Sequence, residues 1–371
     1  MMKKSIFWKI TGLAALIFGL GAGFTSCHDN IYSMIEMEVV QEDGLNGDIS
    51  QIVPFNGSLW CTNYKLYKKD ITPSSSTGCY NGQWHHVNAT CNGSELEFIT
   101  TIATDGSKLY CYTVQWEEDG DDSVNIPYYK RVYSSSDGET WTQIDIHSIT
   151  GHGDSSDSYA VNTVMHVFDN RAGDGTNSFT GRKAFVRLYN PSTDSYEIHE
   201  LSGTTVSSSV ASGSSGSDFS AVYINGSTKF SNSLDMVAGN GKAYRTSGSD
   251  IEYSSNGSDW TSVDFDKGTI WALALTADYL LVGTSDGIFR SHLDSGVPSS
   301  RATDFSNNAQ SLLTSRVTGL YVLDSSKNEG ETDEYGSMII SGYLSSSSDT
   351  FGEIGLYAYY PGRGVWNRDG D

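Results

Sequence analysis

Short runs of hydrophobic residues alternate with clusters of turn residues along most of this chain. Runs such as 270–275 and 279–284 are rich in aliphatic and aromatic side chains, and Gly, Ser, Asn and Asp separate such runs throughout. Runs of this length bounded by turn residues are typical of β-strands. Beyond residue 47, no window of about eleven residues has the i, i+3, i+4, i+7 spacing of an amphipathic helix. The pattern predicts an all-β protein.

Two segments, 136–146 and 255–265, share one sequence pattern. In each, an Asp-Gly or Asn-Gly pair precedes a Trp by a few residues, and an alternating strand follows. An Asp or Asn followed by Gly tolerates the positive φ angles of a tight hairpin, and the indole can pack over that turn. The pattern therefore predicts structural turn residues at Asp137, Gly138, Trp141, Asn256, Gly257 and Trp260.

Weaker copies of this unit extend the series along the chain. The aromatic residues that close the units stand at positions 84, 141, 196, 260, 305 and 366. Their spacing is somewhat longer than the ~40–50 residues of a four-stranded propeller blade, which leaves room for surface loops. The repeat predicts a single β-propeller over residues 48–371 with six four-stranded blades. A count of seven blades is the alternative, because residues 207–233 are long enough to hold another strand pair.

The last unit is expected to supply its own four strands, at 317–323, 338–343, 355–360 and 365–368. Closure of the ring could then add residues 34–40 as an extra outer strand, or it could rest on side-chain packing alone. Either arrangement removes exposed sheet edges, which would otherwise be open to aggregation.

The segment 136–141 resembles an Asp-box (BNR-type) repeat, and 255–260 resembles it with Asn256 in place of the Asp. Both are one residue shorter than the fuller motif. The resemblance implies a propeller of the kind found in sialidases and in many non-enzymatic proteins, where the box braces a turn far from catalysis. The N-terminal arginine motif of sialidases is not found in this sequence, so the resemblance supports the fold and not the activity.

The N-terminus has the layout of a signal peptide. Positively charged residues precede a charge-free apolar stretch, 10–24, and Phe24-Thr25-Ser26-Cys27 resembles a lipobox with Phe24 where Leu is usual. We expect removal of residues 1–26, acylation of Cys27, and a polar tether over 27–47. The chain would then be anchored in the bacterial cell envelope, on its periplasmic or surface face. Ordinary secretion, with Cys27 incidental, is the alternative.

The formal net charge of −22 constrains the partners of the domain. An acidic surface argues against nucleic acid, whose phosphates require Lys and Arg, and against close contact between the protein body and anionic lipid. Such a body is expected to be held off the membrane as a monomer, and to bind a protein or glycan. Aromatic residues make up 12% of the chain, which suits such contacts.

Beyond the signal segment the cysteines are Cys61, Cys79, Cys91 and Cys111. Export would allow them to oxidise, and four cysteines allow three pairings, so disulfides among them are favoured over buried free thiols. They show no Cys-x-x-Cys spacing, which makes a zinc site improbable.

For each remaining motif, a structural role explains the residues better than catalysis or metal binding does. Gly283-Thr284-Ser285-Asp286-Gly287 matches a nucleophile elbow, but a strand and not a helix is expected to follow it. His85 and His86 would point to opposite faces of a strand. Acidic clusters at 117–122, 169–177 and 329–334 leave weak calcium binding open, without EF-hand spacing. We therefore predict no catalytic, cofactor-binding or metal-binding residues.

Two function classes remain. The first is a membrane-anchored lipoprotein whose propeller is a non-catalytic binding or scaffolding module for a protein or glycan partner. The alternative is a carbohydrate-active enzyme, sialidase-like or another glycosidase, with carboxylates at the mouth of the propeller channel. A convergence of paired acids and arginines on one axial pocket would favour the enzyme.

Overall fold

The computed structural model divides into two compact units, residues 1–44 and 45–371. It describes residues 45, 49, 51–71, 83–118, 125–146, 166–170, 179–190, 195–214, 219–239, 241–276, 278–293, 300–301, 316–324, 337–343, 355–360 and 365–368. These residues all belong to the second unit, and they form strands, turns and irregular segments without a helix. Accordingly, none of the described segments is a helix able to cross a membrane. The expected signal peptide and Cys27 lie outside the described residues.

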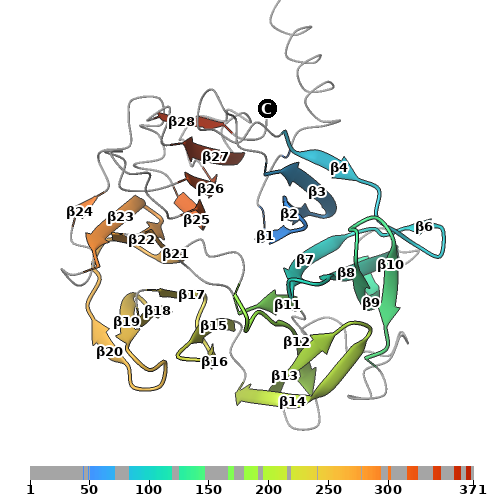
Figure 1. Cartoon of the computed structure of the whole chain (residues 1–371), viewed down its shortest axis with the longest axis horizontal. Coiled ribbons are helices and arrows are strands. Elements are labelled where there is room, and N and C mark those ends of the chain that lie inside the picture. Colours follow the sequence, from blue (N-terminus) through green and yellow to red (C-terminus); the bar gives the residue numbers. More distant parts are fainter. Residues whose placement is uncertain are drawn as a thin grey trace, which may run out of the picture. The chain divides into compact units, whose positions relative to one another are not determined.

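Six four-stranded antiparallel sheets account for most of the strands (Figure 1). The first two sheets, with the small hairpin β5–β6 between them, contain β1 (Ile52–Phe55), β2 (Ser58–Asn63), β3 (Lys65–Asp70), β4 (His85–Val87), β5 (Thr90–Cys91), β6 (Ser94–Glu95), β7 (Ile99–Thr104), β8 (Leu109–Glu118), β9 (Asn125–Ser135) and β10 (Trp141–Ile144). The third sheet and the hairpin that follows it contain β11 (His166–Asp169), β12 (Ala184–Asn190), β13 (Ser195–Ser202), β14 (Thr205–Ser214), β15 (Ser220–Ile224) and β16 (Ser227–Ser231).

The last three sheets each use four consecutive strands. They contain β17 (Met236–Gly239), β18 (Lys242–Ser247), β19 (Asp250–Ser254), β20 (Thr261–Val263), β21 (Ile270–Leu275), β22 (Tyr279–Thr284), β23 (Gly287–His292), β24 (Ser300–Arg301), β25 (Arg316–Asp324), β26 (Ser337–Tyr343), β27 (Gly355–Tyr360) and β28 (Val365–Arg368). The final sheet coincides within one residue with the four strands expected for the last unit. The expected extra strand at 34–40 lies outside the described residues.

The first strand of each sheet faces the centre of the ring. Contacts run from β1 to β7, and then through β11, β15, β17 and β21 to β25. Buried hydrophobic residues fill the space between neighbouring sheets, as period-two strands with one face on each neighbour require. One such cluster joins Ile52 and Leu59 of the first sheet to Leu323 and Leu356 of the last. Side-chain packing therefore joins the first and last sheets of the ring.

The predictions of an all-β chain and of a β-propeller arrangement are confirmed. The predicted number of six blades is not. Besides the six four-stranded sheets, the described residues include the hairpin β15–β16, whose inner strand contacts both β11 and β17. This hairpin falls within 207–233, the segment in which an additional strand pair was left open.

Candidate functional site

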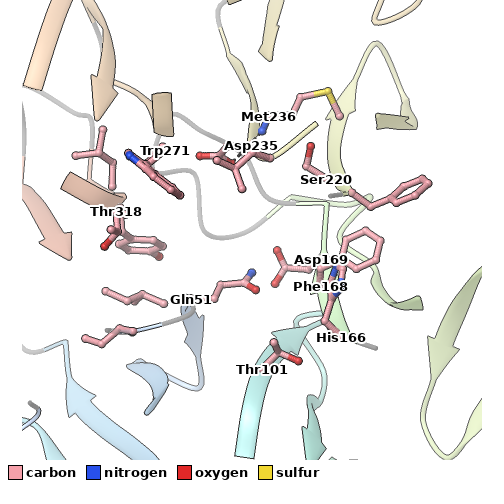
Figure 2. Close-up of a pocket in the computed structure, with 18 of the residues that line it drawn as sticks. Gln51, Thr101, His166, Phe168, Asp169, Ser220, Asp235, Met236, Trp271 and Thr318 are labelled. Carbon is pink, nitrogen blue, oxygen red and sulfur yellow. Dashed lines mark hydrogen bonds between the residues drawn. The ribbon is translucent and has the colours of Figure 1, made fainter. Parts of the chain in front are cut away.

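A pocket of about 270 Å³ lies where the innermost strands converge (Figure 2). Residues of β1, β7, β11, β15, β17, β21 and β25, or directly adjoining them, form its wall. Four residues with aromatic side chains line it together with aliphatic ones: Phe168, Phe219, Trp271 and Tyr321. Apolar walls with a few convergent polar groups are typical of ligand-binding pockets, although this volume is at the small end of their range.

Asp169, the last residue of β11, provides one buried carboxylate in the pocket wall. Its Oδ2 accepts a hydrogen bond from the backbone N–H of Thr104 at 3.2 Å and pairs with Arg182 Nη2 at 3.3 Å. Its Oδ1 is buried and has no hydrogen-bond partner. Figure 2 shows the Gln51 side chain pointing toward Asp169 across the pocket. One oxygen of this carboxylate thus holds neighbouring segments together, while the other is buried without a hydrogen-bond partner.

Two further buried polar atoms in the pocket wall lack hydrogen-bond partners. They are the indole Nε1 of Trp271 on β21 and the hydroxyl Oγ1 of Thr318 on β25. Above the Trp271 ring, the guanidinium carbon of Arg316 lies 3.9 Å from the ring centroid. A buried polar atom left without a partner costs about 1–3 kcal/mol. A ligand or ordered water that satisfies these atoms would recover that cost.

His166 lies on β11 at the pocket wall, and its imidazole is neutral at physiological pH. Burial and, to a smaller extent, the positive charge of Arg187 lower its pKa to about 3, although a hydrogen bond with the backbone of Phe219 partly opposes both. Both perturbing groups come from outside the local sequence of β11. The histidine therefore adds no positive charge to the pocket, and its low pKa makes it a poor general acid near pH 7.

Asp235, directly before β17, is the second carboxylate in the wall, and it has a structural role. Its Oδ1 accepts a hydrogen bond from the N–H of Met236 at 2.9 Å, and its Oδ2 accepts one from Leu273 at 2.7 Å. The second bond joins the start of β17 to β21 of the next sheet. With both oxygens bonded to backbone, Asp235 is held in place and is poorly suited to transfer protons.

The first predicted turn motif forms a network at the β9–β10 hairpin. Asp137 Oδ1 accepts hydrogen bonds from the N–H groups of Glu139 and Thr140, both at 2.8 Å. Trp141, buried with 2% exposure, donates from Nε1 to the Gly138 carbonyl at 2.9 Å. Although burial raises the pKa of Asp137, the hydrogen bonds that it accepts lower it overall.

The second motif repeats this network at the β19–β20 hairpin. Asn256 Oδ1 accepts hydrogen bonds from the N–H groups of Ser258 at 2.8 Å and Asp259 at 2.9 Å. Trp260 is only half-buried, and the Arg245 guanidinium lies 4.1 Å from its ring centroid. Both hairpins are built from outer strands, and none of the six turn residues lines the pocket.

Each motif also docks against an Asn-Gly hairpin of the preceding strands, which the sequence analysis did not identify. Asn56, between β1 and β2, donates from Nδ2 to the Ser136 carbonyl at 3.2 Å. Asn225, between β15 and β16, donates in the same way to the Ser255 carbonyl at 2.9 Å. The only sequence signal was the similarity of 55–58 to 224–227.

The structure describes three of the four cysteines among which disulfides are predicted. Cys91 and Cys111 carry free thiols in one hydrophobic cluster, Cys61 is buried in another, and Cys79 lies outside the described residues. Burial, with a smaller contribution from Cys91, raises the pKa of Cys111 well above its usual value. Disulfide formation stays a prediction. Within the described ranges, no group of three or more His, Cys, Asp or Glu side chains could hold a metal ion.

The remaining motifs occupy ordinary positions in the strands. His85 and His86 belong to β4, where His85 is exposed and His86 packs edge-on against Tyr67. Gly287 of the Gly-x-Ser-x-Gly segment begins strand β23, so no helix follows the serine. The three acidic clusters lie largely outside the described residues. The pocket residues were not predicted as a site. Trp271 lies in the run 270–275, which was expected to be a strand, but the other residues of the pocket come from distant segments.

No known family model matches this chain, and no curated protein is significantly similar in sequence. Several solved structures resemble it, each with low sequence identity and a low TM-score. The extracellular domain of BT4673 from B. thetaiotaomicron is 11% identical, with a TM-score of 0.39 over 85% of this chain and 39% of that one. PorZ, a surface component of the type-IX secretion system of Porphyromonas gingivalis, is 11% identical, with a TM-score of 0.43 over 86% of this chain and 52% of that one.

A luciferin-regenerating enzyme is 10% identical, with a TM-score of 0.40 over 86% of this chain and 92% of that one. The first two structures are extracellular or surface components of bacterial envelope proteins, and this chain spans only about two-fifths to one-half of their length. It spans most of the length of the third. At such low identity and TM-score, these similarities carry no argument about activity, and the site must be interpreted from its own geometry.

Proposed function

We propose that this protein is an exported lipoprotein, anchored through Cys27, whose propeller is a non-catalytic binding module for a glycan or protein partner. The axial pocket is the observation that carries this proposal. It combines aromatic rings with three buried polar atoms that lack protein partners, at Asp169, Trp271 and Thr318. Polar groups of the partner that enter the pocket would satisfy these atoms and exclude water from the rings.

The alternative function, glycoside hydrolysis, finds less support in this pocket. Such enzymes use two carboxyl groups, one on each side of the scissile bond. Among the described residues of the wall, the carboxylates are Asp169 and Asp235. Asp235 accepts backbone hydrogen bonds on both oxygens, and Asp169 is paired with Arg182. Neither arrangement leaves an acid–base pair facing a substrate.

For the ring itself, we propose seven blades, with β15–β16 as the inner half of the fourth. Its Asn225-Gly226 turn docks against the following Asp-box-like motif as the Asn56-Gly57 turn of the first sheet does. Both turns have positive φ at both residues, 51° and 79° in one and 49° and 73° in the other. An equivalent hairpin in an equivalent position supports counting it as a blade.

The binding proposal can be tested with the full-length protein in its native envelope. Leu234 lines the pocket and is 42% exposed, whereas Val210 on β14 is 44% exposed and lies outside the pocket wall. Leu234→Arg should reduce recovery of a cross-linked partner at least tenfold, and Val210→Arg should leave it unchanged. Equal recovery from both variants would contradict a pocket site. Glycoside turnover abolished by Asp169→Asn would favour the enzyme instead.

A further inference from the structure

We infer that the group received by the axial pocket is a neutral sugar residue of a glycan. This inference rests on the proposed binding function and narrows it to one ligand class. The ligand would have to match three properties of the pocket at once: its charge balance, its unpartnered hydrogen-bonding atoms and its aromatic wall.

The charge balance of the pocket excludes a strongly charged ligand. Three wall residues, Asp169, Asp235 and His166, have side chains that could carry a charge near neutral pH, and each is either compensated or neutral. Arg182 pairs with Asp169, two backbone N–H groups bind Asp235, and His166 is neutral because its pKa is lowered to about 3. A carboxylate or ammonium entering this pocket would lose hydration without gaining an unpaired counter-charge from these three wall residues.

The unpartnered atoms require a ligand that both donates and accepts hydrogen bonds. Asp169 Oδ1 can only accept in its ionised form, Trp271 Nε1 can only donate, and Thr318 Oγ1 can do either. Adjacent hydroxyl groups on one small ring supply both functions at close spacing. A purely apolar group would leave all three atoms unsatisfied, at the cost of their desolvation.

The aromatic wall provides the complementary apolar surface. Trp271 and Tyr321 lie on neighbouring strands β21 and β25, and Phe168 and Phe219 lie at β11 and β15. A sugar ring carries C–H groups on its faces and hydroxyls at its edge, so it can pack on aromatic rings while its edge forms hydrogen bonds. A pocket of about 270 Å³ suits one such ring and not a longer oligosaccharide.

The test is binding of the full-length protein to an array of neutral, acidic and amino-sugar glycans, followed by calorimetric titration of those that bind. Trp271→Phe and Thr318→Val each remove one hydrogen-bonding group; the first keeps an aromatic ring, and the second keeps nearly the same shape. Trp260→Phe and Thr205→Val are the matched controls, because neither residue lines the pocket. We expect binding of neutral glycans, weakened about tenfold by each pocket variant and by neither control.

A second readout is the indole N–H resonance of Trp271, which should shift when the neutral sugar is added. Selective binding of acidic or amino-sugar glycans, neutral-sugar binding that both pocket variants leave unchanged, or no glycan binding at all would each overturn the inference. Capture of a protein partner that Leu234→Arg abolishes, in the absence of glycan binding, would refute the sugar ligand while preserving the binding function. Failure of both experiments would refute both proposals.

Discussion

At the scale of single residues, the neighbours of a side chain determine its role more than its type does. Asp169 and Asp235 are both carboxylates of the pocket wall, yet only Asp169 keeps an oxygen without a partner. Neither could be distinguished from the other acidic residues in the sequence, because Arg182, Thr104 and Leu273 approach them from other segments. Long-range contacts therefore defined the site.

The low pKa of the half-buried His166 predicts a specific loss of stability in acid. Its pKa is about 3 in the folded chain against about 6.5 when unfolded, so between these values the unfolded chain binds the proton and the folded chain does not. Stability should consequently fall as pH is lowered through 6.5 toward 3, by on the order of 2 kcal/mol at pH 4.5 from this residue.

Urea unfolding at pH 7 and 4.5 measures the loss of stability, and this loss should be smaller in the His166→Gln variant. An equal loss in that variant would contradict the assignment.

The two turn tryptophans should differ in their contribution to folding. Trp141→Ala should cost about 3–5 kcal/mol, because the indole is fully buried and bonded to Gly138. Trp260→Ala should cost less, about 1–2 kcal/mol, because this indole is only half-buried. Chemical denaturation of the two variants gives both values. If Trp260→Ala cost more stability than Trp141→Ala, the difference in exposure between the two indoles would not explain their contributions to folding.

At the scale of elements, local pattern predicted the turns but not what they dock against. The Asp-Gly pair and the Trp specify the β9–β10 hairpin through bonds within six residues, all visible in the sequence. The contact of this hairpin with Trp60 of β2 joins two sheets, and nothing near Gly138 in the sequence indicates it. The register between sheets depends on such distant contacts.

Gly138 offers a direct test of this docking. It has a φ of 83°, and an added Cβ would clash with the Trp60 ring. Gly203 has a φ of 63°, and an added Cβ there would have no heavy atom within 4 Å. Gly138→Ala should cost about 3 kcal/mol or more from strain and overpacking, and Gly203→Ala about 1 kcal/mol from strain alone. Combining Gly138→Ala with Trp60→Leu should show a coupling energy of at least about 0.5 kcal/mol in a double-mutant cycle. Similar costs at both glycines would contradict the docking.

At the scale of the whole molecule, the strand pattern was sufficient for the fold class and for the last sheet. It was insufficient for the number of blades, because β15–β16 lies beside a Ser-rich segment with little hydrophobic alternation. The pocket was beyond prediction from sequence, since its wall draws on strands from β1 to β25 that only ring closure brings together.

The proposed anchor makes a prediction for the whole chain. Cys27→Ala should release the protein from membranes, because the acyl chains that hold it would be absent. Fractionation of cells expressing each form, with mass spectrometry of the N-terminal peptide, measures this. Membrane partition that is unchanged by the substitution, together with an unmodified native N-terminus, would rule out lipid anchoring.

Site-specific photo-cross-linking in intact cells tests the central claim, binding at the axial pocket, most directly. A photoreactive amino acid would replace Leu234 at the pocket wall or Val210 on β14, two positions of similar exposure. We predict a defined cross-linked product from position 234, diminished by competing ligand, and none from position 210. Products from position 210 alone, or none from position 234 in a correctly folded protein, would contradict the assignment of the pocket as the binding site.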